Sequence, residues 1–266
     1  KVESLPSEEA CVQLSRDVPL ITKVSVATTD ATAGSIDIHW TKPAASDLDT
    51  ILNPGPYRYR LLRAEGLNGT SFQPVPNGDF ESATFAGAND TIFVDTDLNT
   101  AGTAYTYKVE FYVNGENTPL GETNAAASVF LGAAPTDEAV NLSWEEMVPW
   151  DNFEYTIFRQ NAQGTFDSIG TSSTTTFQDV GLENGVEYCY KVLAFGTYGI
   201  EGVISPLPNF SQEICTTPGD NVPPCPPTLT SVWSRSTAQS CFAALVPASL
   251  NSIDIPLSLN TQTPPL

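Results

Sequence analysis

The stretch IDIHW (36–40) alternates apolar and polar residues and ends in a tryptophan, and it returns later in the chain as VNLSW (140–144). Alternation with a period of two predicts a β-strand that buries one of its faces. Each copy is followed by an aromatic-rich strand pattern, YRYRLLR (57–63) in the first and FEYTIFR (153–159) in the second. The same features in the same order indicate one folding unit used twice.

Later parts of the two copies match as well. Each carries the pattern T-x-F-x-D, then a leucine three residues on, then Y-x-Y-K-V. In the first copy these lie at 91–95, Leu98 and 105–109. In the second copy they lie at 175–179, Leu182 and 188–192. Short alternating runs separated by Gly, Asn and Pro, without a convincing helical pattern, are typical of an antiparallel β-sandwich. The last strand of the first unit is expected at 124–131, and a strand at 71–76 should lie at an edge because it contains prolines.

The repeat divides the chain into two complete units, predicted at 18–131 and 132–218, and 266 residues is a length that favours two domains. SEEAC (7–11) also matches SQEIC (211–215), with a proline eight residues after each cysteine. Residues 1–17 are therefore expected to be the C-terminal strand and linker of a preceding unit.

Residues 219–266 are rich in Ser, Thr and Pro and lack the tryptophan and Y-x-Y features. They are expected to be a linker followed by the incomplete or disordered start of a further unit.

Charge excludes some classes of partner. The chain has 31 acidic and 11 basic residues, a net charge of −20, which would repel nucleic acid and anionic membranes. It also has no apolar run of the roughly 20 residues that a membrane-spanning helix needs. We predict no nucleic-acid partner and no membrane insertion.

The cysteines predict disulfide chemistry. If the strands around Cys189 and Cys215 are antiparallel neighbours, these two residues lie opposite each other on the outer face, and we predict a disulfide between them. Cys225 and Cys241 form a second candidate pair, and the partner of Cys11 would lie in the preceding unit. Disulfides are typical of extracytoplasmic proteins, so an extracellular or cell-surface location is expected.

The sequence contains few candidate catalytic residues. His39 is the only histidine, and its place between Ile38 and Trp40 points it away from the core, so neither a three-histidine zinc site nor a Ser-His-Asp triad is expected. Glu145 and Glu146 could be a pair of glycosidase carboxylates, but solvated acids at a strand end are the favoured interpretation. We nominate no catalytic residue and predict that the chain is not an enzyme.

Binding chemistry offers three candidates. Asp47 with Asp49, and Asp95 with Asp97, could provide calcium ligands, although no EF-hand spacing is present; no cofactor is otherwise predicted. Trp150 is a candidate ligand-facing aromatic for stacking on a polysaccharide, but the favoured interpretation is that it packs against the edge of a module or a linker.

The repeated residues together resemble fibronectin type III domains. In that family a tryptophan on the second strand lies in the core, and a tyrosine preceded by a leucine closes the corner before the sixth strand. The resemblance covers about 18–218 and implies an all-β chain of tandem antiparallel sandwiches of fibronectin type III, immunoglobulin-like type. It assigns core roles to Trp40, Trp144, Tyr105, Tyr188, Leu98 and Leu182.

A narrower likeness lies in the second unit. The runs LSWEExVPW (142–150), YCYKV (188–192), NFSQEIC (209–215) and DxxPPCxP (220–227) resemble module arrays in large surface proteins of gliding Bacteroidetes. That resemblance implies export by the type IX secretion route and a chain that is a fragment of a longer protein.

These observations favour a non-catalytic spacer of a large secreted or cell-surface protein that supports adhesion or gliding. The partners would be neighbouring modules of the same chain, and beyond them cell-surface proteins or polysaccharide. Two alternatives remain: a carbohydrate-binding or adhesive module, and an accessory region of a secreted hydrolase whose catalytic domain lies elsewhere.

Overall fold

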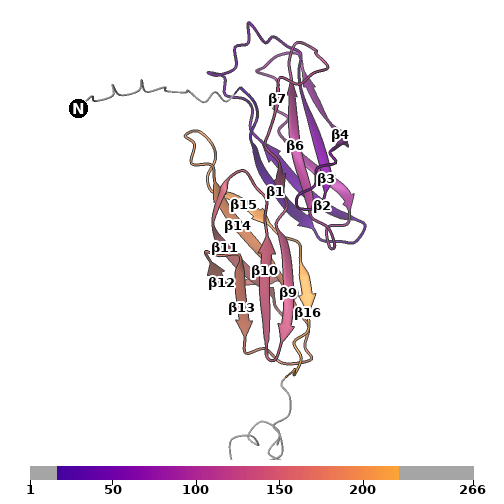
Figure 1. The fold of residues 1–266 in the computed structure, drawn as a ribbon, viewed down its shortest axis with the longest axis vertical. Coiled ribbons are helices and arrows are strands. Elements are labelled where there is room, and N and C mark those ends of the chain that lie inside the picture. Colours follow the sequence, from indigo (N-terminus) through magenta and orange to yellow (C-terminus); the bar gives the residue numbers. More distant parts are fainter. Residues whose placement is uncertain (1–16, 222–266) are drawn as a thin grey trace, which may run out of the picture. The chain divides into compact units, whose positions relative to one another are not determined.

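The computed structural model describes residues 17–221. The expectations for the segments before and after them, including Cys11 and the Cys225–Cys241 pair, lie outside the described residues. The described chain consists of antiparallel β-strands joined by turns and loops, without a helix (Figure 1). The all-β antiparallel fold predicted from the sequence is confirmed.

The first sandwich places a three-stranded sheet against a larger one. The three-stranded sheet has the order β1 (Ile21–Thr28), β2 (Gly34–Trp40), β5 (Ile92–Leu98). The larger sheet has the order β4 (Gln73–Ser82), β3 (Tyr57–Glu65), β6 (Tyr105–Tyr112), β7 (Gly121–Glu122), with β8 (Ala126–Ala127) also pairing with β6.

The second sandwich repeats this order. Its three-stranded sheet runs β9 (Phe130–Thr136), β10 (Ala139–Glu145), β13 (Thr176–Val180). Its larger sheet runs β12 (Phe166–Ser172), β11 (Asp151–Gln160), β14 (Tyr188–Thr197), β15 (Leu207–Phe210), and β16 (Ile214–Thr216) pairs with β14 further along.

The tryptophan-ended strands provide the centre of each core. Trp40 and Trp144 are each only 3% exposed, and their rings lie 5.8 Å from Tyr59 and 5.0 Å from Tyr155. Inward residues of β2 alternate with half-buried outward ones, as a period of two requires. Each sandwich therefore buries its own cluster of apolar side chains.

Two expected strands differ in extent. The prediction of a single strand at 124–131 is wrong. Ala126 and Ala127 pair with β6, whereas Phe130 and Leu131 begin β9 and pair with β10. The apolar run is thus shared between two sheets, which alternation alone does not reveal. The edge strand expected at 71–76 extends to Ser82 as β4, and it pairs only with β3.

Candidate functional site: the seam between the sandwiches

The corner tyrosines take the positions that the resemblance implies. The hydroxyl oxygen of Tyr105 accepts a hydrogen bond from the backbone N–H of Asn99 at 3.1 Å, and that of Tyr188 accepts one from Glu183 at 3.0 Å. The corner leucines, Leu98 and Leu182, are buried. A tyrosine that packs its ring and satisfies a loop N–H holds the corner before β6 and before β14.

The cysteine pair closes the end of the second sandwich. Cys189 and Cys215 are direct neighbours on β14 and β16 and form a disulfide with an S–S distance of 2.02 Å. Glu187 lies beside them, and these three form the only group of three or more metal-ligating side chains gathered within residues 17–221. Because the two sulfurs are bonded to each other, the group is not a ligand set for a metal ion.

Asp95 belongs to an ion-pair clasp that sequence reasoning missed. Its carboxylate accepts hydrogen bonds from the Arg63 guanidinium at 2.7 Å and from the Tyr107 hydroxyl at 2.9 Å. Asp95 lies on β5, and its two partners lie on β3 and β6, so the clasp joins the two sheets. The second sandwich has the same clasp, in which Asp179 on β13 accepts from Arg159 at 2.7 Å and from Tyr190 at 2.9 Å.

The clasp changes the interpretation of the predicted calcium pair. Asp95 is buried and engaged by Arg63, whereas Asp97 is exposed and accepts a hydrogen bond from Thr96. In the other pair, Asp49 accepts hydrogen bonds from the backbone of its own loop, at the N–H groups of Ile51 and Leu52. The signal that could have identified the clasp is the arginine that ends both aromatic-rich strand patterns, together with the repeated T-x-F-x-D.

The candidate catalytic side chains are bound to structural partners. His39 Nε2 lies 2.9 Å from Asp37 Oδ1, and Lys23 Nζ lies 2.6 Å from the other oxygen of that carboxylate. Glu146 accepts hydrogen bonds from Asn152 and Tyr155, and its neighbour Glu145 is exposed. These contacts are those of outward-facing and strand-end residues that support the sheets.

Trp150 is not the ligand-facing aromatic that the sequence offers as a candidate; the structure supports the other interpretation, in which it packs against the edge of a module. The residue is 6% exposed and packs with the core cluster of the first sandwich, 5.8 Å from the ring of Tyr198. Its indole N–H donates to Asn152 at 3.0 Å. The ring lies over Gly196, where an added Cβ would come within 2.3 Å of it, so only glycine leaves room.

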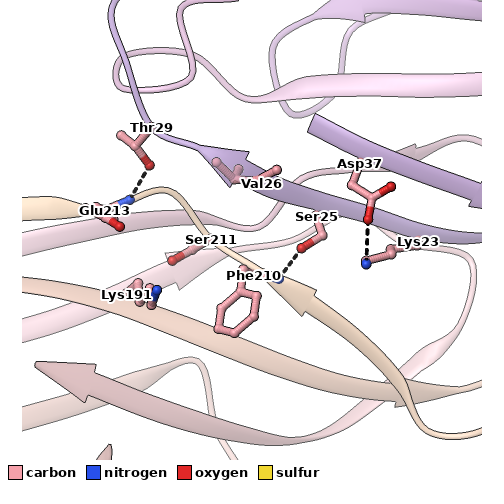
Figure 2. A pocket seen from close by; sticks show the side chains of 10 residues that line it. Lys23, Ser25, Val26, Thr29, Asp37, Lys191, Phe210, Ser211 and Glu213 are labelled. Atoms are coloured by element: carbon pink, nitrogen blue, oxygen red, sulfur yellow. Dashed lines mark hydrogen bonds and ion pairs between the residues drawn. The ribbon is translucent and has the colours of Figure 1, made fainter. Parts of the chain in front are cut away.

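Trp150 belongs to what we call the inter-sandwich seam, formed by 21–29 and Ala127 of the first sandwich and 198–213 of the second, with 147–150 beside them. The described residues, 17–221, belong to one compact unit. Five hydrogen bonds cross the seam. The second sandwich donates three of them: Tyr198 Oη to Ile21 O (2.7 Å), Phe210 N to Ser25 Oγ (2.9 Å) and Glu213 N to Thr29 Oγ1 (2.8 Å). The first sandwich donates two: Val24 N to Asn209 Oδ1 (2.8 Å) and Ala127 N to Met147 O (2.7 Å). Figure 2 shows the bonds at Ser25 and Thr29.

A small pocket opens along the seam. Its volume is about 240 Å³, and its lining includes Lys23 and Asp37 from the first sandwich and Lys191, Phe210 and Glu213 from the second (Figure 2). The Lys191 ammonium lies 4.2 Å from the centre of the Phe166 ring and 5.1 Å from that of Phe210. The pocket is smaller than the roughly 300–1,000 Å³ typical of ligand sites, and its charges balance, as expected of a crevice within an interface.

Buried tyrosines predict a loss of stability at alkaline pH. Burial raises the pKa of Tyr59, Tyr190 and Tyr198 above the ordinary value of 10.0, and at Tyr190 the hydrogen bond to Asp179 and its charge add to the effect. The native state therefore keeps protons that the unfolded chain loses above about pH 10, so the free energy of unfolding should be level below that pH and fall above it. Urea titrations at pH 9 and about pH 11 would measure this, and an unchanged midpoint would contradict it.

Comparisons with known proteins identify similar folds only. No protein-family model and no curated protein matches the sequence. Among solved structures, the chain is similar to the sixth fibronectin type III domain of human fibronectin type III domain containing protein 3, with 18% identity, coverage of 35% of this chain and 86% of that chain, and a TM-score of 0.29. It is also similar to a segment of two fibronectin type III domains from chicken tenascin, with 18% identity, coverage of 73% and 96%, and a TM-score of 0.23.

The strand order of the chain itself carries the fold assignment. Each sandwich sets three strands against a sheet in which the fourth, third and sixth strands of the repeat are neighbours, and each has a core tryptophan and a tyrosine corner. The fold is a tandem pair of antiparallel β-sandwiches, with the strand order, core tryptophan and tyrosine corner expected from the resemblance to fibronectin type III domains. Within residues 17–221 no helix has the length and apolar character needed to cross a membrane.

Proposed function

We propose that this chain is a non-catalytic spacer in an extracellular or cell-surface protein, in which the two sandwiches are held in a fixed relation to each other. The seam carries this proposal. It joins the sandwiches by backbone and side-chain hydrogen bonds and by burial of Trp150 and Leu207 with the core cluster of the first sandwich. A loosely tethered pair would lack buried contacts of this kind, because relative motion is the default for domains with small, polar interfaces.

The disulfide supports an oxidising location for the spacer, since such bonds persist outside the cytoplasm. The partners that we propose are neighbouring modules of the same chain, and beyond them cell-surface proteins. The adhesive or gliding setting rests on the sequence resemblance of 142–227 to surface proteins of gliding bacteria. The carbohydrate-binding alternative depended on Trp150 as its exposed aromatic, and the burial of that residue removes its main support.

A spacer of this kind should tumble in solution as one body. Residual dipolar couplings of backbone amides in the two sandwiches are expected to fit a single alignment tensor, because the seam fixes their orientation. Gly196→Leu is expected to displace Trp150 from its place over β14 and to give each sandwich a tensor of its own. Two different tensors in the unmodified chain would overturn the proposal.

A further inference from the structure

The segment after β14 closes the second sandwich with an amide side chain. Ser211 exchanges two hydrogen bonds with Val192 on β14, both at 2.9 Å. Gln212, which is 1% exposed, then reaches the first strand of its own sandwich: its Oε1 accepts from Leu131 N at 3.0 Å and its Nε2 donates to Leu131 O at 2.7 Å. Leu131 lies opposite Trp144, so Gln212 secures the edge of β9 beside the core tryptophan.

The first sandwich lacks this latch. Thr123 occupies the place of Ser211, since it exchanges hydrogen bonds of 2.9 and 3.1 Å with Val109, the residue equivalent to Val192 in Y-x-Y-K-V. The next residue, Asn124, corresponds to Gln212 but is exposed. Its shorter side chain therefore does not cover the edge of β1 as Gln212 covers that of β9.

The second sandwich provides the missing contacts. Ile21 lies opposite Trp40, as Leu131 lies opposite Trp144, and its carbonyl oxygen accepts a hydrogen bond from the Tyr198 hydroxyl at 2.7 Å. Further along β1, Val24 N–H donates to the side chain of Asn209, which is 2% exposed. A strand edge left open would present unpaired backbone groups. On β1, Tyr198 and Asn209 of the other sandwich pair two of these groups.

We infer that 207–216 is a shared segment: it closes the second sandwich and also holds the first strand of the first sandwich, so that the two sandwiches unfold as one cooperative unit. This inference goes beyond the spacer role, which requires fixed geometry but not coupled stability. It also gives the disulfide a second effect. Cys215 lies two residues after Glu213, whose N–H binds Thr29, so the bond to Cys189 limits the freedom of the segment that holds β1.

Hydrogen exchange of backbone amides in the full 266-residue chain tests the inference. In Asn209→Ala, exchange at Val24 is expected to accelerate at least ~10-fold, because a buried N–H loses its acceptor. Gln212→Ala is the matched amide deletion and is expected to accelerate Leu131 more than Val24. Asn124→Ala, at the exposed equivalent position, should change neither. Unchanged exchange at Val24 in Asn209→Ala would overturn the inference.

A second, milder variant tests the same contact if Asn209→Ala does not fold. Ser25→Ala removes the acceptor of Phe210 N–H from the side of the first sandwich and changes little volume; it should accelerate exchange at Phe210 without loss of the native spectrum. Removing the disulfide with Cys189→Ala and Cys215→Ala together should also accelerate exchange at Val24. If only amides of β14 and β16 respond to that change, the coupling is refuted.

Urea unfolding followed residue by residue separates the inference from the spacer role. Amides of both sandwiches should lose their native signals at one urea concentration. Two distinct midpoints in a chain whose dipolar couplings still fit one tensor would leave the spacer role standing and would overturn the shared segment.

Discussion

Replacing Trp144 with alanine is expected to lower the free energy of unfolding by about 3–5 kcal/mol, enough to unfold a marginally stable domain. The indole is almost fully buried, lies against Tyr155 and belongs to a cluster with Leu131, Leu142 and Ile157. Strand β10 is paired with β9 on one side and β13 on the other, so we expect the substitution to leave a cavity in the core. Urea titration followed by circular dichroism would measure the loss.

Trp144→Phe provides the matched control. The indole N–H of Trp144 is buried without a hydrogen-bond partner, as is that of Trp40. Phenylalanine removes this unsatisfied donor and keeps most of the ring, so the loss should be well below that of alanine. His39→Ala, on the outward side of the matching strand, should be close to neutral. A loss below about 1 kcal/mol in Trp144→Ala would show that the core does not depend on the tryptophan.

Asp179→Ala is expected to destabilise the second sandwich by about 3 kcal/mol. The change leaves the Arg159 guanidinium and the Tyr190 hydroxyl without the carboxylate that both contact between the sheets. The estimate lies at the low end for a broken buried pair because the Arg159 side chain is 33% exposed and water can reach it. Chemical denaturation of the variant at neutral pH would measure the effect.

Asp179→Asn separates charge from hydrogen bonding. The amide oxygen still accepts from Tyr190 but carries no charge for Arg159, so the loss should be intermediate. Glu154→Ala, which removes an exposed acid from β11, should change the stability little. If Asp179→Ala proves no more harmful than Glu154→Ala, the clasp contributes nothing to stability.

The sequence predicted those parts of the structure that repeat and alternate. The tryptophan strands and the Y-x-Y strands have a period of two, so their buried faces follow from the residues alone. The pairing of Cys189 with Cys215 needed the further assumption that their strands are antiparallel neighbours, which β14 and β16 are. The clasp was missed because Arg63 and Asp95 lie on different sheets, and no local period links a strand of one sheet with a strand of the other.

The seam was not predictable for a related reason. In the sequence, Trp150 looks like an exposed aromatic that could bind a ligand. Only the structure, in which its ring lies over Gly196 and packs with the first sandwich, shows that it is buried. Nothing in the run around Asn209 predicts that its amide side chain accepts a hydrogen bond from the Val24 N–H. Contacts between sequence-distant segments, such as these, depend on how the two copies meet.

The exposed Asn124 and the buried Gln212 also bear on how such arrays can be rearranged. A unit whose first strand is secured by its own glutamine can stand at any position, whereas a unit that borrows Asn209 and Tyr198 requires that particular successor. The two copies are therefore not interchangeable. If they were transposed, or if a foreign unit were inserted between them, the edge of β1 would be left open. Gene duplication followed by such dependence would fix the order of neighbours in the array.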